Sequence, residues 1–341
     1  MYLLPRPQEM LLQDNVFYVD YTAEICIDPE ASPEWLHYAS LLQKEIEQDT
    51  GFHLNINRNL PVFQTPSILL KSTSGHSQQE YTLRIRESGI LLTASSNSGM
   101  LYAIQTLRQI IRQEGACLPG LDIHDFPVIS NRGLYYDVTR SRIPTLSYLK
   151  KMADTLSFYK INQLHLYIEH TYMFRNLSEV WRDDTPLTSS DILELDRYCA
   201  DLGIELVPSI ASFGHLYKIL RTKSFRHLCE REDLCEEPFG FIDRMEHHTI
   251  DVSNEESFSF IWSLIEEYLP LFRSDKFNIC GDETFDLGTG KSHELAEREG
   301  TQQLYIQYIK KLCDALVTHG KTPMFWGDLV CRLLLEHSVL P

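Results

Sequence analysis

The most constraining feature of this 341-residue chain is a run of alternating strand and helix patterns that begins near residue 128. Three times a helical pattern ends in Asn or Gly and a strand pattern starts almost at once, at Lys160-Ile161-Asn162, Asp201-Leu202-Gly203 and Thr318-His319-Gly320. Short helix-to-strand links with a left-handed cap residue are typical of repeated βα units. Such repeats predict an α/β fold with helices outside a parallel sheet, which is either a barrel or a doubly wound sheet.

Five strand patterns follow one another in this region. They are Leu134–Thr139, Gln163–Ile168, Ile204–Ser209, Phe277–Cys280 and Thr322–Trp326. No Gly-x-Gly-x-x-Gly or P-loop pattern follows any of them, which weakens a nucleotide-binding interpretation. After the fifth, residues 329–341 suffice for about one helix, whereas a closed barrel needs eight strands. If the repeats form a barrel, it is incomplete at its C-terminus, and the chain is either a fragment of a longer protein or a fold completed by another chain, as in a homo-oligomer.

The first part of the chain has a different pattern. Strand patterns at Ser67–Lys71 and Tyr81–Arg86 precede Ser88-Gly89, which turns the chain into Ile90–Ala94 as a hairpin. A helix follows, with Leu101, Ile104, Leu107 and Ile111 on one face. Asp125-Phe126-Pro127 marks the boundary, so we expect a small α+β domain over residues 1–126 and the barrel domain over residues 127–341.

Composition excludes several classes of function. The chain is 43% apolar and can bury a large core, while a net charge of −17 without a Lys/Arg stripe speaks against nucleic-acid binding. No apolar stretch reaches membrane-spanning length, and the first residues, with early prolines and acids, are unlike a secretory signal. The eight scattered cysteines predict free thiols in a reducing compartment. We expect a cytoplasmic protein that uses no metal and no cofactor and acts on a small molecule.

Polar and aromatic residues gather at the strand ends, where barrel enzymes place their active sites. Following the five strands in order are Asp137, Thr139 and Arg140 (with Arg132 just before the strand), then Glu169 and His170, Ser212–His215, Asp282-Glu283, and finally Trp326 and Asp328. Carboxylates, a histidine, an arginine and a tryptophan without a metal or nucleotide motif suit a sugar substrate. Glycoside hydrolysis needs a carboxylic acid that keeps a proton, and like-charge repulsion in a shared cleft favours this.

Each of these residues also has a structural interpretation. An Asp-Glu pair is usually a solvated turn, and Arg132 fits a salt-bridged strand end. His215 fits a hydrogen-bonded turn histidine, and Trp326 on a strand is more often core than a sugar platform. Position at five successive strand ends is what favours an active site.

Several segments resemble glycoside hydrolase family 20, the β-N-acetylhexosaminidases. Phe277–Glu283, with its Gly-Asp-Glu motif, is similar to the family's strand and acid pair. Arg132–Arg140, Lys160–Leu166 and Val207–His215 are similar to its first three barrel strands, and Tyr81–Ile111 resembles the small α/β domain that precedes the barrel. The likeness extends over roughly residues 67 to 328, in the family's order.

The resemblance implies a retaining, substrate-assisted mechanism, in which the 2-acetamido oxygen of the sugar attacks C1. It implies that Asp282 orients the acetamido N–H and that Glu283 is the general acid and base. Arg132 would bind ring hydroxyls, His215 would belong to a polar relay near Glu283, and Trp326 would form a wall of the acetamido pocket. Asp328, at the end of the same strand, is taken as a further substrate-binding residue.

The chain also departs from the family pattern. Asn278 stands where the family usually has His, and Cys280 where it has Gly. The second strand ends in Glu169-His170 in place of an Asp pair. Three functions therefore stay open: an exo-acting β-N-acetylhexosaminidase, an incomplete or inactive sugar-binding fragment of one, and another retaining glycosidase with Asp282 or Glu283 as nucleophile.

Overall fold

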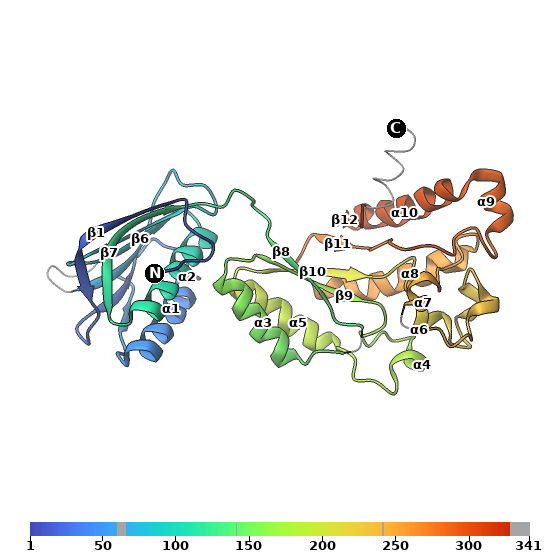
Figure 1. Ribbon diagram of the computed structural model, residues 1–341, viewed down its shortest axis with the longest axis horizontal. Helices are drawn as coiled ribbons and strands as arrows, with labels where there is room; N and C mark the ends of the chain where they lie inside the picture. Colours follow the sequence, from blue (N-terminus) through green and yellow to red (C-terminus); the bar gives the residue numbers. More distant parts are fainter. Residues whose placement is uncertain (60–65, 141, 241, 328–341) are drawn as a thin grey trace. The chain divides into compact units, whose positions relative to one another are not determined.

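The computed structural model describes residues 1–59, 66–140, 142–240 and 242–327, and it divides into two compact units (Figure 1). The first unit contains Met1–Arg132 together with Met152–Asn162 and Ala200–Ile204. The second contains Gly133–Lys151, Gln163–Cys199 and the chain from Glu205 onward. The two short pieces in the first unit are the ends of two helices and the links that follow them.

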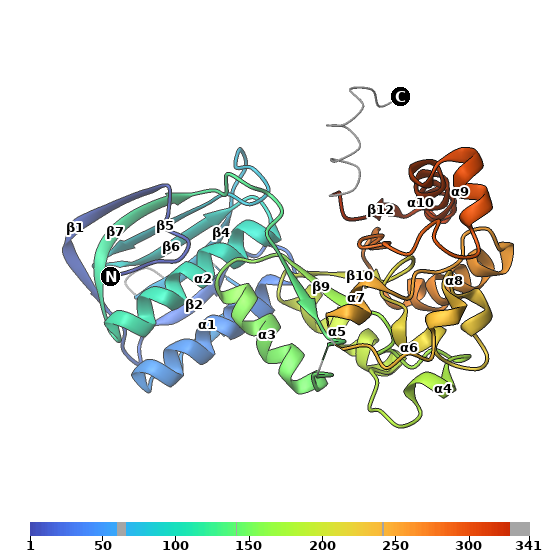
Figure 2. The same cartoon turned by 45° about the vertical axis from the view of Figure 1, so that its right-hand side comes forward.

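The first unit is a mixed sheet with two helices on one of its faces (Figure 2). Its elements are β1 (Glu9–Tyr18), β2 (Glu24–Ile27), α1 (Trp35–Thr50), β3 (Asn55–Asn57), β4 (Ser67–Ser72), β5 (Tyr81–Arg86), β6 (Gly89–Ala94), α2 (Asn97–Glu114) and β7 (Cys117–Asp125). Within the described residues the strand order is β1-β7-β5-β6-β4-β2-β3. The core lies between the sheet and the apolar faces of α1 and α2, where Leu42, Leu83 and Ile104 are fully buried.

The strand β7 was not predicted, although it pairs antiparallel with both β1 and β5. Pro119 and Gly120 interrupt its pattern, and both residues usually weaken a strand. The fold accommodates them at an irregularity, where the β1 register shifts between Leu12 and Val16 and Pro119 pairs with Val16.

The second unit is built on a parallel sheet. Its strands are β8 (Gly133–Asp137), β9 (Gln163–Ile168), β10 (Glu205–Ile210), β11 (Lys276–Asn278) and β12 (Thr322–Met324). Its helices are α3 (Leu146–Phe158), α4 (Ser178–Trp181), α5 (Ser189–Asp201), α6 (Tyr217–Leu220), α7 (Asp243–Glu246), α8 (Glu255–Tyr268), α9 (His293–Glu299) and α10 (Thr301–Thr318), with 3-10 turns η1 (Arg226–Leu228), η2 (Glu232–Leu234) and η3 (Leu269–Leu271). In the described part of the chain the strands follow one another in sequence order, from β8 to β12. All their carboxyl ends therefore meet at one edge of the sheet.

The predicted helix-to-strand links are present, and each has a residue in the left-handed region. These are Lys160, Gly203 and Gly320, with φ of 61°, 69° and 71°. In the first link the left-handed residue is thus Lys160, whereas the pattern had suggested Asn162. Asn162 instead accepts a hydrogen bond on its side-chain oxygen from the backbone N–H of Arg132, at 2.7 Å.

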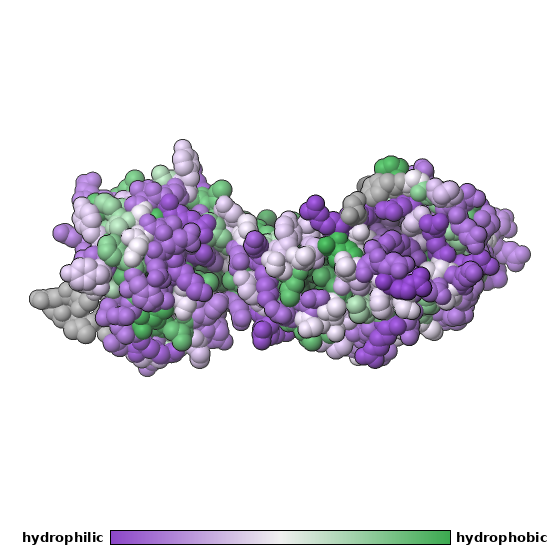
Figure 3. Space-filling model, turned by 90° about the horizontal axis from the view of Figure 1, so that it is seen from below, coloured by the Kyte–Doolittle hydropathy of each residue, from purple (hydrophilic) through white to green (hydrophobic). Residues whose placement is uncertain are grey.

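Hydrophilic side chains cover most of the face drawn in Figure 3, with smaller apolar areas between them. None of the helices in the described ranges combines the length and the apolar character of a membrane span. The described cysteines are free, and five of them (26, 199, 229, 235 and 280) are buried.

Candidate active site

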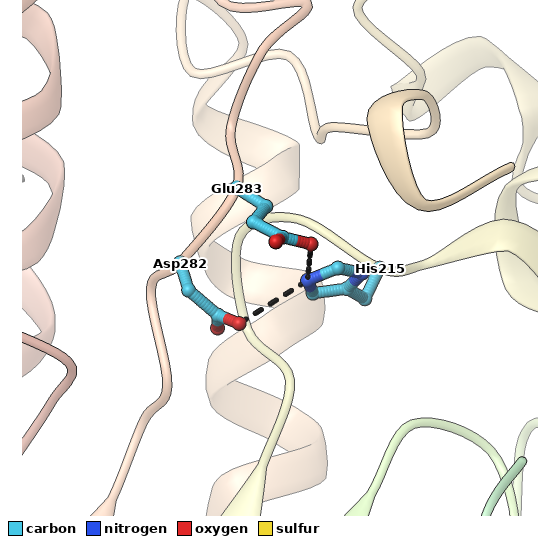
Figure 4. Close-up of side chains that lie close together, drawn as sticks. All are labelled: His215, Asp282 and Glu283. Atoms are coloured by element: carbon cyan, nitrogen blue, oxygen red, sulfur yellow. Dashed lines mark hydrogen bonds and ion pairs between the residues drawn. The ribbon is translucent and has the colours of Figure 1, made fainter. Parts of the chain in front are cut away.

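Three side chains meet at the carboxyl edge of the parallel sheet (Figure 4). His215 follows β10, and Asp282 and Glu283 follow β11. The Nε2 atom of His215 lies 3.2 Å from Oδ2 of Asp282 and 3.3 Å from Oε2 of Glu283. The imidazole is almost fully buried, with 2% of its side chain exposed, whereas 24% of Asp282 and 44% of Glu283 is exposed. One buried ring nitrogen therefore faces two carboxylates that solvent reaches.

The backbone that presents these groups is in an unusual conformation. Cys280, Gly281 and Glu283 have φ of 60°, 81° and 49°, and His215 has φ of 61°. Non-glycine residues rarely adopt this region, and each such residue costs on the order of 1 to 3 kcal/mol unless its surroundings hold it there. Two loops that are otherwise far apart in the sequence are thus both held in strained shapes where their side chains meet.

Packing behind the loops explains why these shapes persist. A Cβ atom on Gly214 would lie 2.8 Å from the backbone oxygen of Asp282 and 3.1 Å from that of Glu283. The two loops can approach this closely because position 214 has no side chain. From α10, the Tyr305 hydroxyl donates to the Gly281 carbonyl at 3.0 Å, and the Tyr308 hydroxyl donates to the Ser212 carbonyl at 3.1 Å.

A second contact network lies beneath the acid pair. The Tyr135 hydroxyl on β8 is 2.8 Å from Ser209 Oγ on β10, and both oxygens are 3.4 Å from Cys280 Sγ. The Trp326 ring meets the Tyr135 ring edge-on, with centroids 4.8 Å apart, and the backbone N–H of Trp326 donates to the Cys280 carbonyl at 2.9 Å. Trp326 thus lies at the same strand ends as the acid pair, and the Cys280 thiol contacts the hydroxyl groups of Tyr135 and Ser209 beneath that pair.

The carboxyl ends of β8 and β9 add a charged cluster. Arg140 pairs with Asp137 at 3.2 Å and with Glu169 at 3.4 Å, and Glu169 accepts a hydrogen bond from the Tyr167 hydroxyl at 2.9 Å. Burial raises the pKa of Glu169, and the neighbouring Arg140 and His215 oppose that rise. The Tyr167 ring meets His215 edge-on at 6.5 Å, which connects this cluster to the acid pair.

Arg132 is not brought to this edge. It precedes Gly133 at the amino end of β8, and its guanidinium donates to Gln79, to the Tyr102 hydroxyl and to the Lys160 carbonyl within the first unit. The arginine at the carboxyl edge is Arg140, which belongs to the same group of strand-end residues in the sequence. The sugar-binding role of Arg132 stays a prediction, and Arg140, eight residues further along the chain, is the arginine that lies beyond the carboxyl end of β8. Asp328 lies outside the described residues.

A loop from the third βα unit packs beside His215. The N–H of Leu216 donates to the His248 carbonyl, and the N–H of Ile250 donates to the Phe213 carbonyl. Asp286, three residues beyond Glu283, accepts from the His248 N–H at 3.0 Å and lies 2.9 Å from the His247 ring nitrogen. Burial lowers the pKa of His248 to about 4, so its ring is neutral near pH 7.

This arrangement can move a proton at one atom while it binds a polar group at a neighbouring one. Glu283, the more exposed acid, is available to a leaving group in solvent reach. The Oδ1 atom of Asp282 is buried and, among the described residues, has no hydrogen-bond partner. Burying a carboxylate oxygen without a hydrogen-bond partner costs free energy. A hydrogen-bond donor on a bound ligand would satisfy this oxygen.

Comparison with known proteins identifies the family of the chain. The family model described as glycosyl hydrolase family 20, catalytic domain, matches residues 130–339, and the model described as domain 2 of that family matches residues 1–126. A beta-hexosaminidase of Porphyromonas gingivalis is 24% identical over 96% of this chain and 45% of its own length. A beta-hexosaminidase of Akkermansia muciniphila is 26% identical over 90% of this chain and 63% of its own length. The chain thus spans about half the length of these relatives.

Solved structures of related proteins have the same fold. A Flavobacterium johnsoniae chitobiase superimposes with a TM-score of 0.81 at 22% identity, over 96% of this chain and 52% of its own. A Streptomyces plicatus N-acetyl-beta-hexosaminidase, in complex with Thio-NAglucal, superimposes with a TM-score of 0.80 at 21% identity, over 96% and 66%. The predicted fold, a (β/α) barrel domain preceded by a small α+β domain, is confirmed, and the described strands β8 to β12 are its first parallel strands.

The close approach of Gly214 to the acid pair predicts a large effect from one methyl group. In Gly214→Ala the new Cβ must displace the Asp282 and Glu283 backbone, so we expect kcat to fall about a hundredfold while the protein stays folded. Gly133→Ala is the matched control, because its Cβ would meet Gln163 and His165 at ordinary distances. Circular dichroism and steady-state kinetics on an N-acetylglucosaminide measure both effects; equal rates in the two variants would contradict the role of Gly214.

The buried neutral His248 predicts a loss of stability in acid. Its folded-state pKa lies below the unfolded value near 6.5, so the contribution is complete above pH 6.5 and is lost as pH falls toward 4. The loss amounts to about 3 kcal/mol at pH 4, because each tenfold change in proton binding corresponds to about 1.4 kcal/mol. His248→Asn, which tolerates the positive φ, should reduce the fall in unfolding free energy between pH 7 and 4.

Urea denaturation at several pH values measures this fall, with His227→Asn as a control in which the imidazole is exposed. Identical pH dependence in His248→Asn and the unsubstituted protein would show that His248 is not the titrating group.

Proposed function

The chain belongs to glycosyl hydrolase family 20, and on that premise we propose that it acts as an exo-acting β-N-acetylhexosaminidase. It would release terminal N-acetylglucosamine or N-acetylgalactosamine from a glycan or glycoconjugate with retention of configuration. The observation that carries this proposal is the pairing of an exposed acid, Glu283, with a neighbouring carboxylate whose inner oxygen is buried and lacks a partner within the described ranges.

The proposed reaction uses the substrate's own 2-acetamido group as nucleophile. Asp282 Oδ1 accepts a hydrogen bond from the acetamido N–H, which turns the amide oxygen toward C1 and stabilises the positive charge that develops on the amide. As the C–O bond to the leaving group breaks, Glu283 gives its proton to the leaving oxygen. In this step the acetamido oxygen bonds to C1 and gives a cyclic oxazolinium ion. Water then attacks C1 and loses a proton to Glu283, while the bond between the acetamido oxygen and C1 breaks and restores the acetamido group.

The surrounding residues support this chemistry. His215, within 3.3 Å of both carboxylates, keeps them in position. Trp326 lies over the strand ends on the Tyr135 ring, where an aromatic face suits the apolar side of the acetamido group. Arg140, half-buried beside Asp137 and Glu169, is the guanidinium at this edge that we assign to the sugar hydroxyls.

A second candidate is a sugar-binding fragment without turnover. The observation that favours it is the sheet itself, since β8 and β12 are each paired on one side among the described strands. Relatives such as a Vibrio harveyi exo beta-N-acetylglucosaminidase are nearly twice as long as this chain, which covers 54% of that structure. Binding of N-acetylglucosamine without hydrolysis of any glycoside supports this alternative.

Dependence on the acetamido group distinguishes the proposed mechanism from one with a carboxylate nucleophile. We expect hydrolysis of a nitrophenyl N-acetyl-β-glucosaminide and little hydrolysis of the plain β-glucoside. Glu283→Gln and Asp282→Asn should each lower kcat at least about a hundredfold, because one removes the proton donor and the other weakens the charge that faces the amide. Glu294→Gln, an exposed acid on α9, is the control and should retain the rate. Comparable rates on both substrates, or unchanged rates in both variants, would refute substrate assistance.

The two arginines at the opposite ends of β8 predict different defects. Arg140→Gln should raise KM at least about tenfold, since hydrogen bonds to charged groups contribute on the order of 1.5 to 3 kcal/mol. Arg132→Gln should leave KM within about twofold. It should lower the melting temperature, because it removes the hydrogen bonds from the guanidinium to Gln79 and Tyr102 in the first unit. Kinetics and thermal denaturation separate these outcomes. A raised KM in Arg132→Gln alone would return the sugar-binding role to Arg132.

A further inference from the structure

The three side chains of the candidate active site also form a set of metal-ligand atoms. His215 Nε2 lies 3.2 Å from the Asp282 oxygen and 3.3 Å from the Glu283 oxygen, and one atom from each residue falls within 4.8 Å of the others. In a tetrahedral zinc site, bonds of about 2.0 to 2.1 Å to nitrogen and oxygen place neighbouring ligand atoms roughly 3.3 Å apart. The two distances from Nε2 to the carboxylate oxygens therefore match the separation of neighbouring ligand atoms in such a site.

We propose that this site binds a zinc ion through His215, Asp282 and Glu283, and that zinc thereby inhibits the enzyme. Binding of the ion does not require turnover, whereas its inhibitory consequence rests on the proposed function. One histidine and two carboxylates are zinc ligands of the ordinary kind, and three protein ligands leave a fourth position for water. Where Nε2 carries a proton, the N–H bond breaks, the proton goes to solvent, and the nitrogen lone pair that remains binds the metal.

The site is organised before any ion arrives. His215 is buried and its loop is packed against the acid pair at Gly214, and Tyr305 holds the Gly281 carbonyl. The ligand atoms therefore lose little freedom on binding. Glu283 is 44% exposed, so an ion can reach the site from solvent. The buried Oδ1 of Asp282 is a second oxygen on a coordinating carboxylate and gains from a nearby cation.

Ligand chemistry sets the selectivity. Imidazole nitrogen suits zinc, copper, nickel and cobalt, whereas calcium takes six to eight oxygen ligands and magnesium needs near-octahedral oxygen coordination. A site with one nitrogen and two carboxylates provides neither the oxygen ligands that calcium takes nor the octahedral oxygen coordination that magnesium needs. Zinc and cobalt should therefore bind, while calcium and magnesium at the same concentration should not.

The expected inhibition is competitive with substrate. A zinc-bound Glu283 cannot deliver a proton, and a zinc-bound Asp282 has its charge directed at the metal in place of the acetamido N–H. Because substrate and zinc need the same two carboxylates, a bound sugar should exclude the ion.

The test uses the 341-residue chain, with zinc chloride in calorimetry and cobalt chloride in visible absorption. We expect one zinc per chain and an intense tetrahedral cobalt spectrum. Asp282→Asn, Glu283→Gln and His215→Asn, which tolerates the positive φ, should each weaken zinc binding at least tenfold. His293→Asn removes an exposed histidine that faces one carboxylate, Glu297, and should leave zinc binding unchanged.

Each result decides between the two claims. Zinc binding that is lost in the three site variants supports the metal site even if no glycoside is hydrolysed, in which case the proposed function fails alone. Hydrolysis that depends on the acetamido group, with no calorimetric binding of zinc, overturns the metal site alone. Zinc binding that persists in all three variants, or is lost in His293→Asn, assigns the ion to the surface and also overturns it.

Discussion

The contact on which the site depends is the approach of one buried imidazole to two adjacent carboxylates. It requires that the loop after β10 and the loop after β11 touch through their backbones, which the absence of a side chain at Gly214 permits. It also requires left-handed backbone at His215, Cys280 and Glu283, which α10 and the Tyr135 network hold in place. Only a few residues carry out the proposed chemistry. The parallel sheet and α10 hold the backbone of these residues in its strained, left-handed conformation.

Much of this fold follows from local pattern, and the exceptions have identifiable causes. The strand Gln163–Ile168 has the predicted bounds and is buried along its whole length, as is typical of an inner strand of a parallel sheet. The strand β7 was missed because Pro119 and Gly120 break its pattern, and its place between β1 and β5 depends on pairing with segments far away in the sequence. Local pattern carries no information on such partners.

The sequence predicted several residues of the site but not how they contact one another. The sequence identified Asp282, Glu283 and His215 as strand-end residues, and the structure brings these three together. Arg132 was preferred over Arg140 on the strength of a family resemblance, whereas the direction of β8 places Arg132 before its amino end and Arg140 beyond its carboxyl end. The roles of Tyr135 and Gly214 were not recognised. Tyr135 acts through a hydroxyl that contacts Ser209 on another strand, and Gly214 acts through the absence of a side chain. The cytoplasmic location and the division at residue 126 stay predictions.

The most direct test of the account is the position of a bound oxazolinium mimic. We predict that a crystal structure of the chain with a thiazoline analogue of N-acetylglucosamine places the ring nitrogen about 2.7 to 3.1 Å from Asp282 Oδ1, with Glu283 beside the anomeric carbon. A bound analogue whose ring nitrogen lies away from Asp282 would contradict it.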